Sequence, residues 1–543
     1  MKFPEPPLSV ARETDAATPI RPVLALIVLC LAEMLVLLDN TIVNVALPSM
    51  STALHGSFSQ LQWIVDAYVL TFAGLLLAFG HLGDRYGRRR VMIIGLVGIG
   101  VASVAGAMAG GIGQIIAVRA GMGVFAAAVF PATLALLTTL FRDPRARAGA
   151  VAAWTAMAGF AIAIGPTAGG WLLEHFSWRS VFWINVPIAL VLVAAALLLV
   201  PESRGAHTGP LDVVGILLSL SGVTTLVWTI IEAPQHGWTS QITFLGYAVA
   251  LACLAAFIVR EFRAPYPVLN LRLFAIRRFS LPALSIAVAY FSMFGFLFLI
   301  TQYFQAVREY TPLEFGIHSL PFAVAIGVGA PVAVVLAQRF GTTALIVSGL
   351  AVLAVGMFLA GQVTVDSPYA GIVLVSMILM GLGLAIVQGP ATEAIMSSVH
   401  EDEVGAGAGV NDTTREVGGA LGVAVLGSIV ASTYKTQIWP VIDSIPDSLT
   451  SAADKDFMRQ TAMSIIGLRE RQATSPFAGR IEQIIDQMKI AVLDGFHTAT
   501  LVTVGAVIVC AVVVAIWLPW RRSENQQSVL LGWAETKEPA DVS

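Results

Sequence analysis

The stretch Gly80-His81-Leu82-Gly83-Asp84-Arg85-Tyr86-Gly87-Arg88-Arg89-Arg90 joins two long apolar runs through a short, basic turn. Its glycines permit a tight turn. Asp84 can accept hydrogen bonds from the arginines or from a helix N-terminus, which would latch one conformational state shut. A basic cluster that only stops a helix at the membrane surface would have the same spacing. The spacing alone leaves both interpretations open.

The two runs beside this turn belong to a set of fourteen that are long enough to cross a membrane. A bilayer core of about 30 Å needs roughly twenty residues of apolar helix. The chain is 57% hydrophobic and only 12% charged, which is too apolar for a soluble domain of 543 residues. The sequence therefore predicts an all-α integral membrane protein with fourteen transmembrane helices. The runs cover residues 24–48, 62–83, 91–110, 114–140, 148–173, 180–200, 211–231, 242–260, 279–305, 316–338, 343–362, 370–397, 405–432 and 496–519.

Arginine is concentrated in the short loops on one side of the predicted membrane, whereas the opposite short loops contain only Arg179 and Arg308. Basic loops remain in the cytoplasm. The first run carries Glu33 and Asp39, which a cleavable signal sequence would lack. We therefore expect a multi-pass protein of the cell membrane with both termini in the cytoplasm. The arginines that crowd this side include Arg85, Arg88, Arg89 and Arg90; Arg142, Arg145 and Arg147; Arg260, Arg263, Arg272, Arg277 and Arg278; and Arg521 and Arg522.

The composition argues against several classes of function. A net charge of −3 supplies no basic face for a nucleic acid. Cys30, Cys253 and Cys510 lie far apart within apolar runs, so we expect neither a disulfide framework nor a metal site with paired ligands. The chain contains no phosphate-binding G-x-x-x-x-G-K-[ST] loop and no H-E-x-x-H pattern. We expect no enzymatic activity and no cofactor.

One predicted outer connection, residues 433–494, is long and carries mixed charges. Within it an apolar stripe recurs at helical spacing, which fits a helix lying on the outer membrane surface. A partly disordered loop with one surface helix and a lid over an exit path are both compatible with this pattern. The stripe consists of Ile481, Ile484, Ile485, Met488 and Val492.

The turn at residues 80–90 resembles the major facilitator superfamily, whose loop between the second and third helices reads G-x-L-a-D-r-x-G-r-[rk]. Arg119, Gly121 and Gly123 resemble the pattern R-x-x-[qx]-G of its fourth helix, although Met122 stands where that pattern expects glutamine. Residues 165–170, Gly165-Pro166-Thr167-Ala168-Gly169-Gly170, resemble the G-P-x-x-G-G element of its exporters. Physically, Pro166 bends the helix and the glycines let a neighbouring helix press against it and seal a passage.

Three further stretches, residues 38–48, 178–187 and 405–427, resemble the fourteen-helix drug:proton antiporter branch of this family. The resemblance implies two six-helix bundles with two additional central helices. It also implies proton-driven efflux of amphipathic, often cationic, drugs, without excluding export of an endogenous lipid or amphiphilic metabolite. A monomer in membrane lipid is the favoured state. The implied division is a tail (1–23), a first bundle (24–200), the extra pair with its linkers (201–278), a second bundle (279–519) and a final tail (520–543).

Asp39 and Arg119 are the first pair of ionisable residues within the predicted helices. Such a residue costs about 2.5–3.5 kcal/mol at bilayer depth, so each should face a partner or a wet cavity. Both fall toward the outer halves of their helices, so they could pair across the bundle. A carboxylate that exchanges this partner for a proton would be a proton-coupling site, although a static ion pair has the same sequence signature. By resemblance, this arginine is linked to proton handling.

Asp412 and Glu416 lie four residues apart and therefore share one face of their helix. Two ionised carboxylates on one face repel each other, so one should hold a proton until a cation replaces it. By resemblance, acids at these positions serve cationic substrates. Alternatively, Arg415 neutralises Glu416 as a structural ion pair.

Three other acidic residues are candidate substrate-binding groups. Asp66 lies close in sequence to Trp63 and Tyr68, whose rings could hold an organic cation. Trp63 is equally expected as an anchor at the membrane interface. Glu33 and Glu393 lie within predicted helices without a supporting motif.

Overall fold

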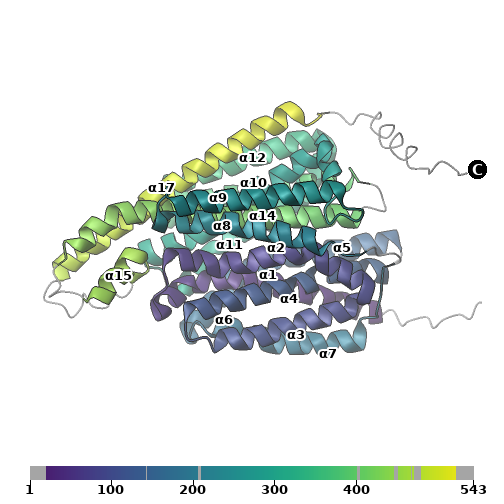
Figure 1. Cartoon of the computed structure of the whole chain (residues 1–543), viewed down its shortest axis with the longest axis horizontal. Coiled ribbons are helices and arrows are strands. Elements are labelled where there is room, and N and C mark those ends of the chain that lie inside the picture. The colour runs from purple at the N-terminus through teal and green to yellow at the C-terminus, as the bar shows by residue number, and fades with distance from the viewer. Residues whose placement is uncertain are drawn as a thin grey trace, which may run out of the picture.

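The computed structural model describes residues 20–141, 143–205, 210–399, 404–445, 451–465, 468–469 and 478–520. Within these ranges the chain is helical without strands, and fourteen helices are long and apolar enough to cross a membrane. Figure 1 shows these helices packed side by side along their lengths. The predicted fold class and number of spans are confirmed. Arg142, Arg521 and Arg522, and most of both predicted tails, lie outside the described residues.

The first bundle contains the helices up to residue 199. α1 packs on α4, α5 and α7, and α4 also contacts α2 and α3. The run predicted over residues 180–200 is divided at Ile184 into one short and one longer helix. The bundle consists of α1 (Ile20–Leu54), α2 (Phe58–Tyr86), α3 (Arg88–Ala107), α4 (Ile112–Leu140), α5 (Pro144–His175), α6 (Ser180–Trp183) and α7 (Asn185–Leu199).

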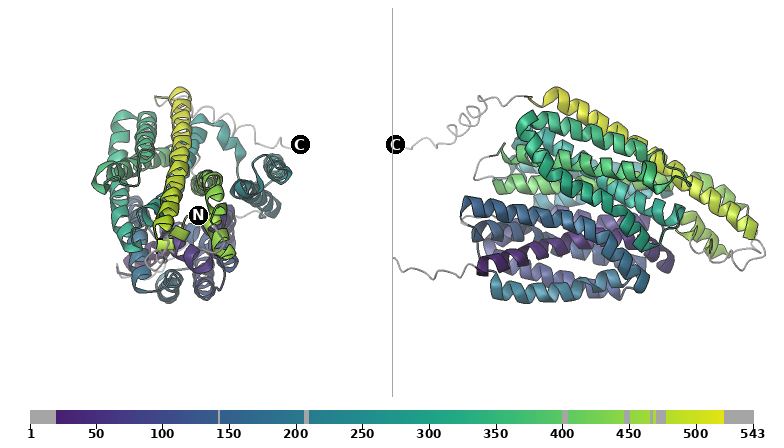
Figure 2. Two further views of the ribbon diagram at one scale, coloured as in Figure 1. Left: turned by 90° about the vertical axis from the view of Figure 1, so that its left-hand side faces the viewer. Right: turned by 180° about the vertical axis from the view of Figure 1, so that it is seen from behind.

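The second bundle contains the helices from residue 277 onward. Its main contacts join α10 to α14, α12 to α13, and α11 to α13. In Figures 1 and 2 this bundle lies above the first. It consists of α10 (Arg277–Gln302) with the π-helical turn η2 (Tyr303–Val307), α11 (Pro312–Phe340), α12 (Thr342–Ala360), η3 (Tyr369–Val373) leading into α13 (Leu374–Met396), α14 (Val404–Asp443), α15 (Ala452–Gln460) and α17 (Ala478–Trp517).

Two further helices, α8 (Val213–His236) and α9 (Gln241–Arg263), form a pair that is followed by the short η1 (Leu271–Ala275). α8 contacts both α2 of the first bundle and α14 of the second. Ser428 of α14 donates a hydrogen bond to the carbonyl of Ile230 on α8 at 2.8 Å. The additional pair therefore covers one seam between the two bundles.

Residues 433–494, predicted as one long outer connection, are partly taken up by the ends of two long helices. α14 continues to Asp443, and α17 begins at Ala478 and runs without interruption into the last membrane span. The apolar stripe around Ile485 and Met488 is helical and buried. The prediction of a separate helix lying on the membrane surface is wrong, because this stripe is covered by protein and belongs to the last transmembrane helix. Figure 1 shows α14, α15 and α17 extending beyond the other helices.

An ion cluster attaches this extension to the turn before α11. Glu309 accepts from Arg469 at 2.8 Å and from Lys489 at 2.5 Å. Partial burial opposes ionisation of Glu309, but these hydrogen bonds outweigh that effect and lower the pKa of its carboxyl.

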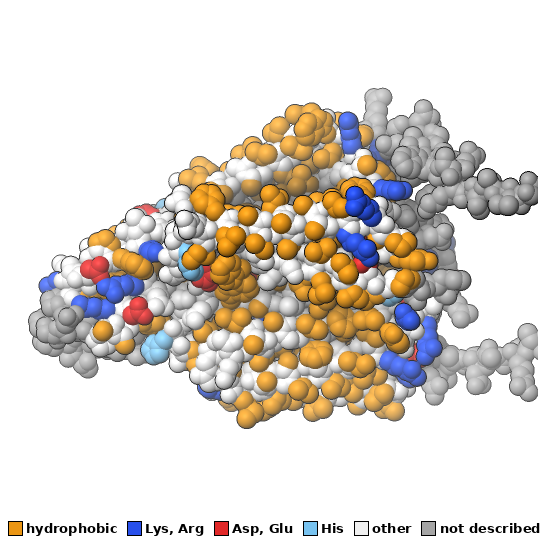
Figure 3. All heavy atoms as spheres, viewed as in Figure 1, with side chains coloured by type: hydrophobic (Ala, Val, Ile, Leu, Met, Phe, Trp, Pro, Cys, Tyr) orange, Lys and Arg blue, Asp and Glu red, His pale blue; other side chains and the backbone are white. Residues whose placement is uncertain are grey.

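The two ends of the helices differ in charge, as Figure 3 shows. Lys and Arg side chains gather at one end of the helices in Figure 3, which we call the arginine-rich end. Arg88 begins α3, Arg145 lies in the first turn of α5 and Arg263 ends α9. The flanks between the ends expose large apolar side chains such as Leu198 and Leu251. A belt of exposed apolar residues is the surface that a multi-pass membrane protein presents to lipid.

At the opposite end, the two bundles touch through glycines. A Cβ added at Gly170 of α5 would overlap the carbonyl of Pro312. A Cβ added at Gly316 of α11 would overlap the carbonyl of Pro166. Gly165 and Gly169 face α1 instead, at Thr41 and Ile42. The G-P-x-x-G-G element therefore packs α5 between α1 and α11, as its small residues suggested.

Two glutamines add polar contacts between the bundles near the same end. Gln62 of α2 donates to the carbonyls of Val423 and Ala424 on α14, each at 2.9 Å. Gln305 donates to the carbonyl of Val45 on α1 at 3.0 Å. In this structure the bundles are thus closed against each other at the end opposite the arginine-rich loops.

We predict that Gly170→Ala and Gly316→Ala each lower the stability of the purified protein by about 1–3 kcal/mol, because the added methyl meets rigid backbone. Thermal unfolding in detergent measures this loss. Gly505→Ala is the matched control, since no atom lies within 4 Å of its added Cβ. If Gly170→Ala and Gly316→Ala both unfolded at the wild-type temperature, the close approach of α5 and α11 would be contradicted.

Candidate functional site

The first buried ion pair joins α1 and α4. Arg119 Nη1 lies 2.5 Å from Asp39 Oδ2, and both side chains are almost completely buried. The Nε atom of Arg119 donates to the carbonyl of Ile64 at 3.1 Å. The structure thus brings together the two residues proposed for proton coupling, in a place that excludes bulk water.

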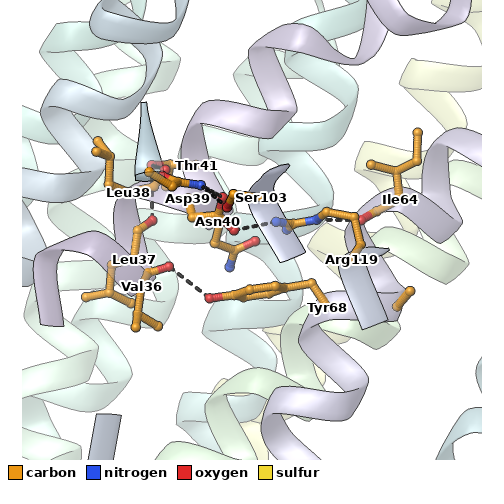
Figure 4. A network of polar contacts seen from close by, with 12 residues as sticks. Val36, Leu37, Leu38, Asp39, Asn40, Thr41, Ile64, Tyr68, Ser103 and Arg119 are labelled. Atoms are coloured by element: carbon orange, nitrogen blue, oxygen red, sulfur yellow. Dashed lines mark hydrogen bonds and ion pairs between the residues drawn. The ribbon is translucent and has the colours of Figure 1, made fainter. Parts of the chain in front are cut away.

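Polar side chains from three other helices complete this site, part of which Figure 4 shows. Asn185 donates to Asp39 Oδ1 at 2.7 Å and to Ser103 Oγ at 3.2 Å. The Tyr68 ring lies 4.2 Å from the Arg119 guanidinium, and its hydroxyl donates to the carbonyl of Val36 at 3.0 Å. Each oxygen of the Asp39 carboxylate therefore receives a hydrogen bond.

The sequence interpretation did not assign a role to Asn185, Ser103 or Tyr68 in this site. Asn185 lies within the stretch 178–187 that resembled the antiporters, and a polar amide in an apolar run is the signal that could have found it. The arrangement makes the Asp39–Arg119 bond depend on the negative charge of the carboxylate.

A second cluster lies on α14. Arg415 Nε lies 3.1 Å from Glu416 Oε1, and Arg415 Nη1 lies 3.8 Å from Asp412 Oδ1. Asn411 donates to Asp412 Oδ1 at 3.2 Å. The arginine therefore interacts with both carboxylates.

Groups from both bundles surround the Arg415 guanidinium. It lies 5.5 Å from the ring centre of Phe130 on α4 and 5.5 Å from that of Tyr290 on α10. Glu33 of α1 is fully buried and interacts electrostatically with Arg415 and Asp412. We call Glu33, Phe130, Tyr290, Asp412, Arg415 and Glu416 the central cluster.

The charge of the central cluster is unbalanced. Its three carboxyl groups face one guanidinium, so the cluster would carry a net charge of −2 if every acid were ionised. The Glu33 oxygens and Glu416 Oε2 are buried without a hydrogen-bond partner among the described residues. Unpaired buried charge is costly. The cluster must therefore take up protons or a cation, and its aromatic faces suit an organic cation.

Asp66 lies outside the central cluster. It is fully buried in α2, and its carboxylate accepts no hydrogen bond from the described residues. Gln62, one turn earlier, contacts α14, so Asp66 lies on the α2 face that meets the second bundle. The Tyr68 ring instead packs against Arg119. The expected pairing of Asp66 with Tyr68 around a cation is therefore not formed in this structure.

Glu393 is also separate from the other acids. It lies near the end of α13 and is exposed. Its neighbour Thr392 donates to Asn411 at 3.1 Å, which places this turn of α13 against the beginning of α14.

The turn between α2 and α3 depends on one of its glycines. Gly87 has a φ of +117°, a conformation that L side chains rarely adopt. Gly80 and Gly83 would meet a Cβ only at ordinary contact distances. The sharp turn is therefore a property of Gly87.

Asp84 does accept a hydrogen bond from an arginine of this turn. Its Oδ1 lies 2.7 Å from Arg88 Nε, whereas the Arg85 side chain is exposed and lies over the Tyr86 ring. Among the described residues, Asp84 bonds to Arg88 and to the backbone of Gly205 and not to the second bundle, so this state shows no Asp84 latch between the bundles.

Glu202, which the sequence interpretation missed, binds the same turn. Its Oε1 accepts from the backbone N–H of Arg89 at 2.9 Å, and its carboxylate lies 3.7 Å from Arg90. Arg89 Nη1 donates to the carbonyl of Val200 at 3.0 Å. An acid at the start of α3 also interacts favourably with the helix dipole. Its position directly after the last apolar residues of α7 was the available signal.

A small cavity of about 20 Å³ lies between the bundles beneath the crossing of α5 and α11. Thr41 and Asn44 of α1 contribute to it, as do Thr301 of α10 and Ser319 of α11. It is far smaller than the roughly 300–1,000 Å³ of a pocket for a drug-sized ligand. The cavity marks the seam between the bundles near their closed end.

The sequence and the fold match those of known transporters. A model of the Major Facilitator Superfamily matches residues 29–423. The multidrug efflux pump LfrA of Mycolicibacterium smegmatis is 34% identical over 499 residues, covering 92% of this chain and 97% of that protein. The puromycin resistance protein pur8 of Streptomyces alboniger is 36% identical over 407 residues, covering 74% and 81%. The tetracenomycin C resistance and export protein of Streptomyces glaucescens is 35% identical over 428 residues, covering 78% and 79%.

Solved structures of other transporters share the fold. A bacterial homologue of the human lysosomal transporter Spinster aligns with a TM-score of 0.59 and 16% identity, covering 94% of this chain and 100% of that one. The nucleoside transporter NupG aligns with a TM-score of 0.58 and 12% identity, covering 91% and 100%. The chain is a transporter and not an enzyme.

We predict that Arg119→Leu destabilises the protein by about 3–5 kcal/mol at neutral pH, because it leaves the buried Asp39 carboxylate without its counter-ion. The loss should shrink as the pH falls, since a proton then removes the unpaired charge. Thermal unfolding of the purified protein measures both effects.

The double variant Asp39→Asn with Arg119→Leu removes both charges and is expected to unfold at a higher temperature than Arg119→Leu alone. Equal stability of Arg119→Leu and wild type would show that the pair contributes little.

Proposed function

The chain belongs to the major facilitator superfamily, and from this membership we propose that it exports amphipathic, often cationic, drugs and toxic compounds in exchange for protons. The central cluster carries the proposal: three carboxyl groups, one guanidinium and two aromatic faces meet between the two bundles. Protons and an organic cation are the two kinds of species that such a cluster can bind alternately. The names of the relatives, which include a multidrug efflux pump and two resistance proteins, support drugs as cargo.

The Asp39–Arg119 pair is the proposed proton-coupling site. Tyr68 interacts electrostatically with Asp39, Arg119 and Glu416, so it lies near groups of both this pair and the central cluster. A proton on Asp39 would weaken its bond to Arg119, and α1 and α4 would then be free to shift relative to each other. Since α1 also carries Glu33, such a shift would alter the central cluster.

The proposed orientation follows from the basic loops. The arginine-rich end faces the cytoplasm of a cell membrane, and both termini lie on that side. The closed end, where α5 crosses α11, then faces outward, so the described state would accept cargo from inside. Proline and glycine in α5 and the turn at residues 80–90 would take part in the change between states.

The energy source sets limits on the exchange. A proton moving inward gains about 2.3 kcal/mol per 100 mV and about 1.4 kcal/mol per pH unit. Exchange of one proton for one monovalent cation moves no net charge, so only the pH difference drives it. A dication needs two protons for neutrality, which several carboxyl groups would permit.

Uptake of ethidium into inverted vesicles that contain the protein tests the proposal. An imposed pH gradient should drive accumulation, and a protonophore should abolish it. Absence of accumulation by a folded, inserted protein would overturn drug export and favour an endogenous lipid or amphiphilic metabolite as cargo.

We predict that Asp39→Asn abolishes uphill ethidium accumulation in this assay, because an amide cannot exchange a proton with Arg119. Asp366→Asn, an exposed acid in the loop before α13, is the control and should transport like wild type. Uphill accumulation by Asp39→Asn would refute the coupling role.

We predict that Asp412→Asn or Glu416→Gln narrows the range of cargo toward monovalent and neutral compounds, since each removes one negative charge from the central cluster. The ratio of dequalinium export to ethidium export measures this change and should fall several-fold. The same Asp366→Asn control should keep the wild-type ratio. An unchanged ratio in both variants would contradict a cargo-binding role.

A further inference from the structure

The guanidinium of Arg415 occupies an environment that matches the needs of an organic cation. It is planar, always charged, and lies over the rings of Phe130 and Tyr290, 5.5 Å from each ring centre. Its nitrogens lie 3.1 Å from Glu416 and 3.8 Å from Asp412. A cationic cargo that bound the central cluster would need the same two rings and the same two carboxylates.

The surroundings of Arg415 do not resemble those of an arginine that only stabilises the fold. Its Nη2 atom is buried and donates no hydrogen bond to the described residues, and Glu416 Oε2 is likewise without a partner. Buried structural ion pairs contribute to stability only when nearly all their hydrogen-bonding atoms are satisfied. Arg119 Nη2 is also buried without a partner among the described residues, but both oxygens of its carboxylate partner Asp39 accept hydrogen bonds, whereas only one oxygen of Glu416 does.

Arg415 also connects the two bundles. Its helix, α14, belongs to the second bundle, whereas Phe130 belongs to α4 and Glu33 to α1 of the first. Displacing the guanidinium would therefore remove a contact between the bundles at the place where cargo arrives.

We propose that Arg415 is a tethered cation that occupies the cargo site and competes with cationic substrates. This inference rests on the proposed function and adds the residue that sets cation affinity. Cargo enters by displacing the guanidinium from Glu416, Asp412 and the two rings. When cargo leaves, the guanidinium returns and covers the carboxylates, so the site is not left with unpaired charge.

The proposal predicts an effect opposite to that of a structural arginine. Removing a tethered competitor raises the affinity for cations, whereas removing a structural partner lowers stability without improving binding. In Arg415→Met the cluster loses its internal cation but keeps an unbranched, flexible side chain. We expect its affinity for tetraphenylphosphonium to rise about tenfold or more, as expected for the loss of one competing cation–π and ion-pair contact.

The experiment measures binding of tetraphenylphosphonium to the purified full chain by titration calorimetry at a fixed, mildly alkaline pH. Arg415→Lys keeps a tethered charge and should bind within a few-fold of wild type. Arg260→Met is the matched control, because Arg260 pairs with Asp212 beside α8, far from the central cluster in sequence and in contacts. It should bind like wild type.

A double variant, Arg415→Met with Glu416→Gln, keeps the test valid if the single variant does not fold. It lacks the competitor and has the same formal charge as the wild-type cluster, so we expect it to fold and to bind more tightly than wild type. Binding by this variant that is equal to or weaker than that of wild type would overturn the proposal, as would the same result for a folded Arg415→Met.

The failure of this inference differs from the failure of the proposed function. Loss of proton-driven ethidium accumulation by wild type would overturn the function. Normal accumulation by wild type together with unimproved tetraphenylphosphonium binding by both Arg415 variants would overturn only the role of Arg415 as a tethered cation.

Discussion

The cost of placing charge where water is excluded is the constraint on which this structure depends. An isolated ion inside a bilayer costs several kcal/mol, so each buried ionisable group needs a partner or a proton. The chain meets this requirement in two ways. Asp39 and Arg119 satisfy each other, with Asn185 completing the contacts of the carboxylate. The central cluster instead holds more acids than bases and is satisfied only when a proton or cation is added.

The two sites occupy different places relative to the two bundles. The Asp39–Arg119 pair lies within the first bundle, between α1 and α4. The central cluster lies between the bundles, because Arg415 of α14 contacts Phe130 of α4. α1 contributes to both sites. A change of protonation in the first site can therefore reach the second through one helix, which is a short mechanical route for coupling.

Much of the fold could be predicted from the sequence, and the departures have physical reasons. Fourteen apolar runs predict fourteen spans because the thickness of the bilayer sets their length. The connection at residues 433–494 was misjudged because an apolar stripe has the same spacing whether it faces lipid headgroups or another helix. Only the neighbours of Ile485 and Met488, which bury both residues, distinguish these cases. Glu202 was missed because its partner, the start of α3, lies more than one hundred residues earlier in the chain.

The sequence by itself determined that this chain spans a membrane, which residues carry charge at that depth, and which acids share a helical face, because these properties depend on composition and on local spacing. It also indicated that Asp39 and Arg119 could meet. Tertiary structure alone decided that Asn185 holds Asp39 and that Tyr68 packs on Arg119. It also decided that Arg415 contacts Phe130 across the bundles and Tyr290 within its own bundle. These contacts join helices that are far apart in the chain. Their geometry depends on how the helices cross, which local spacing does not specify.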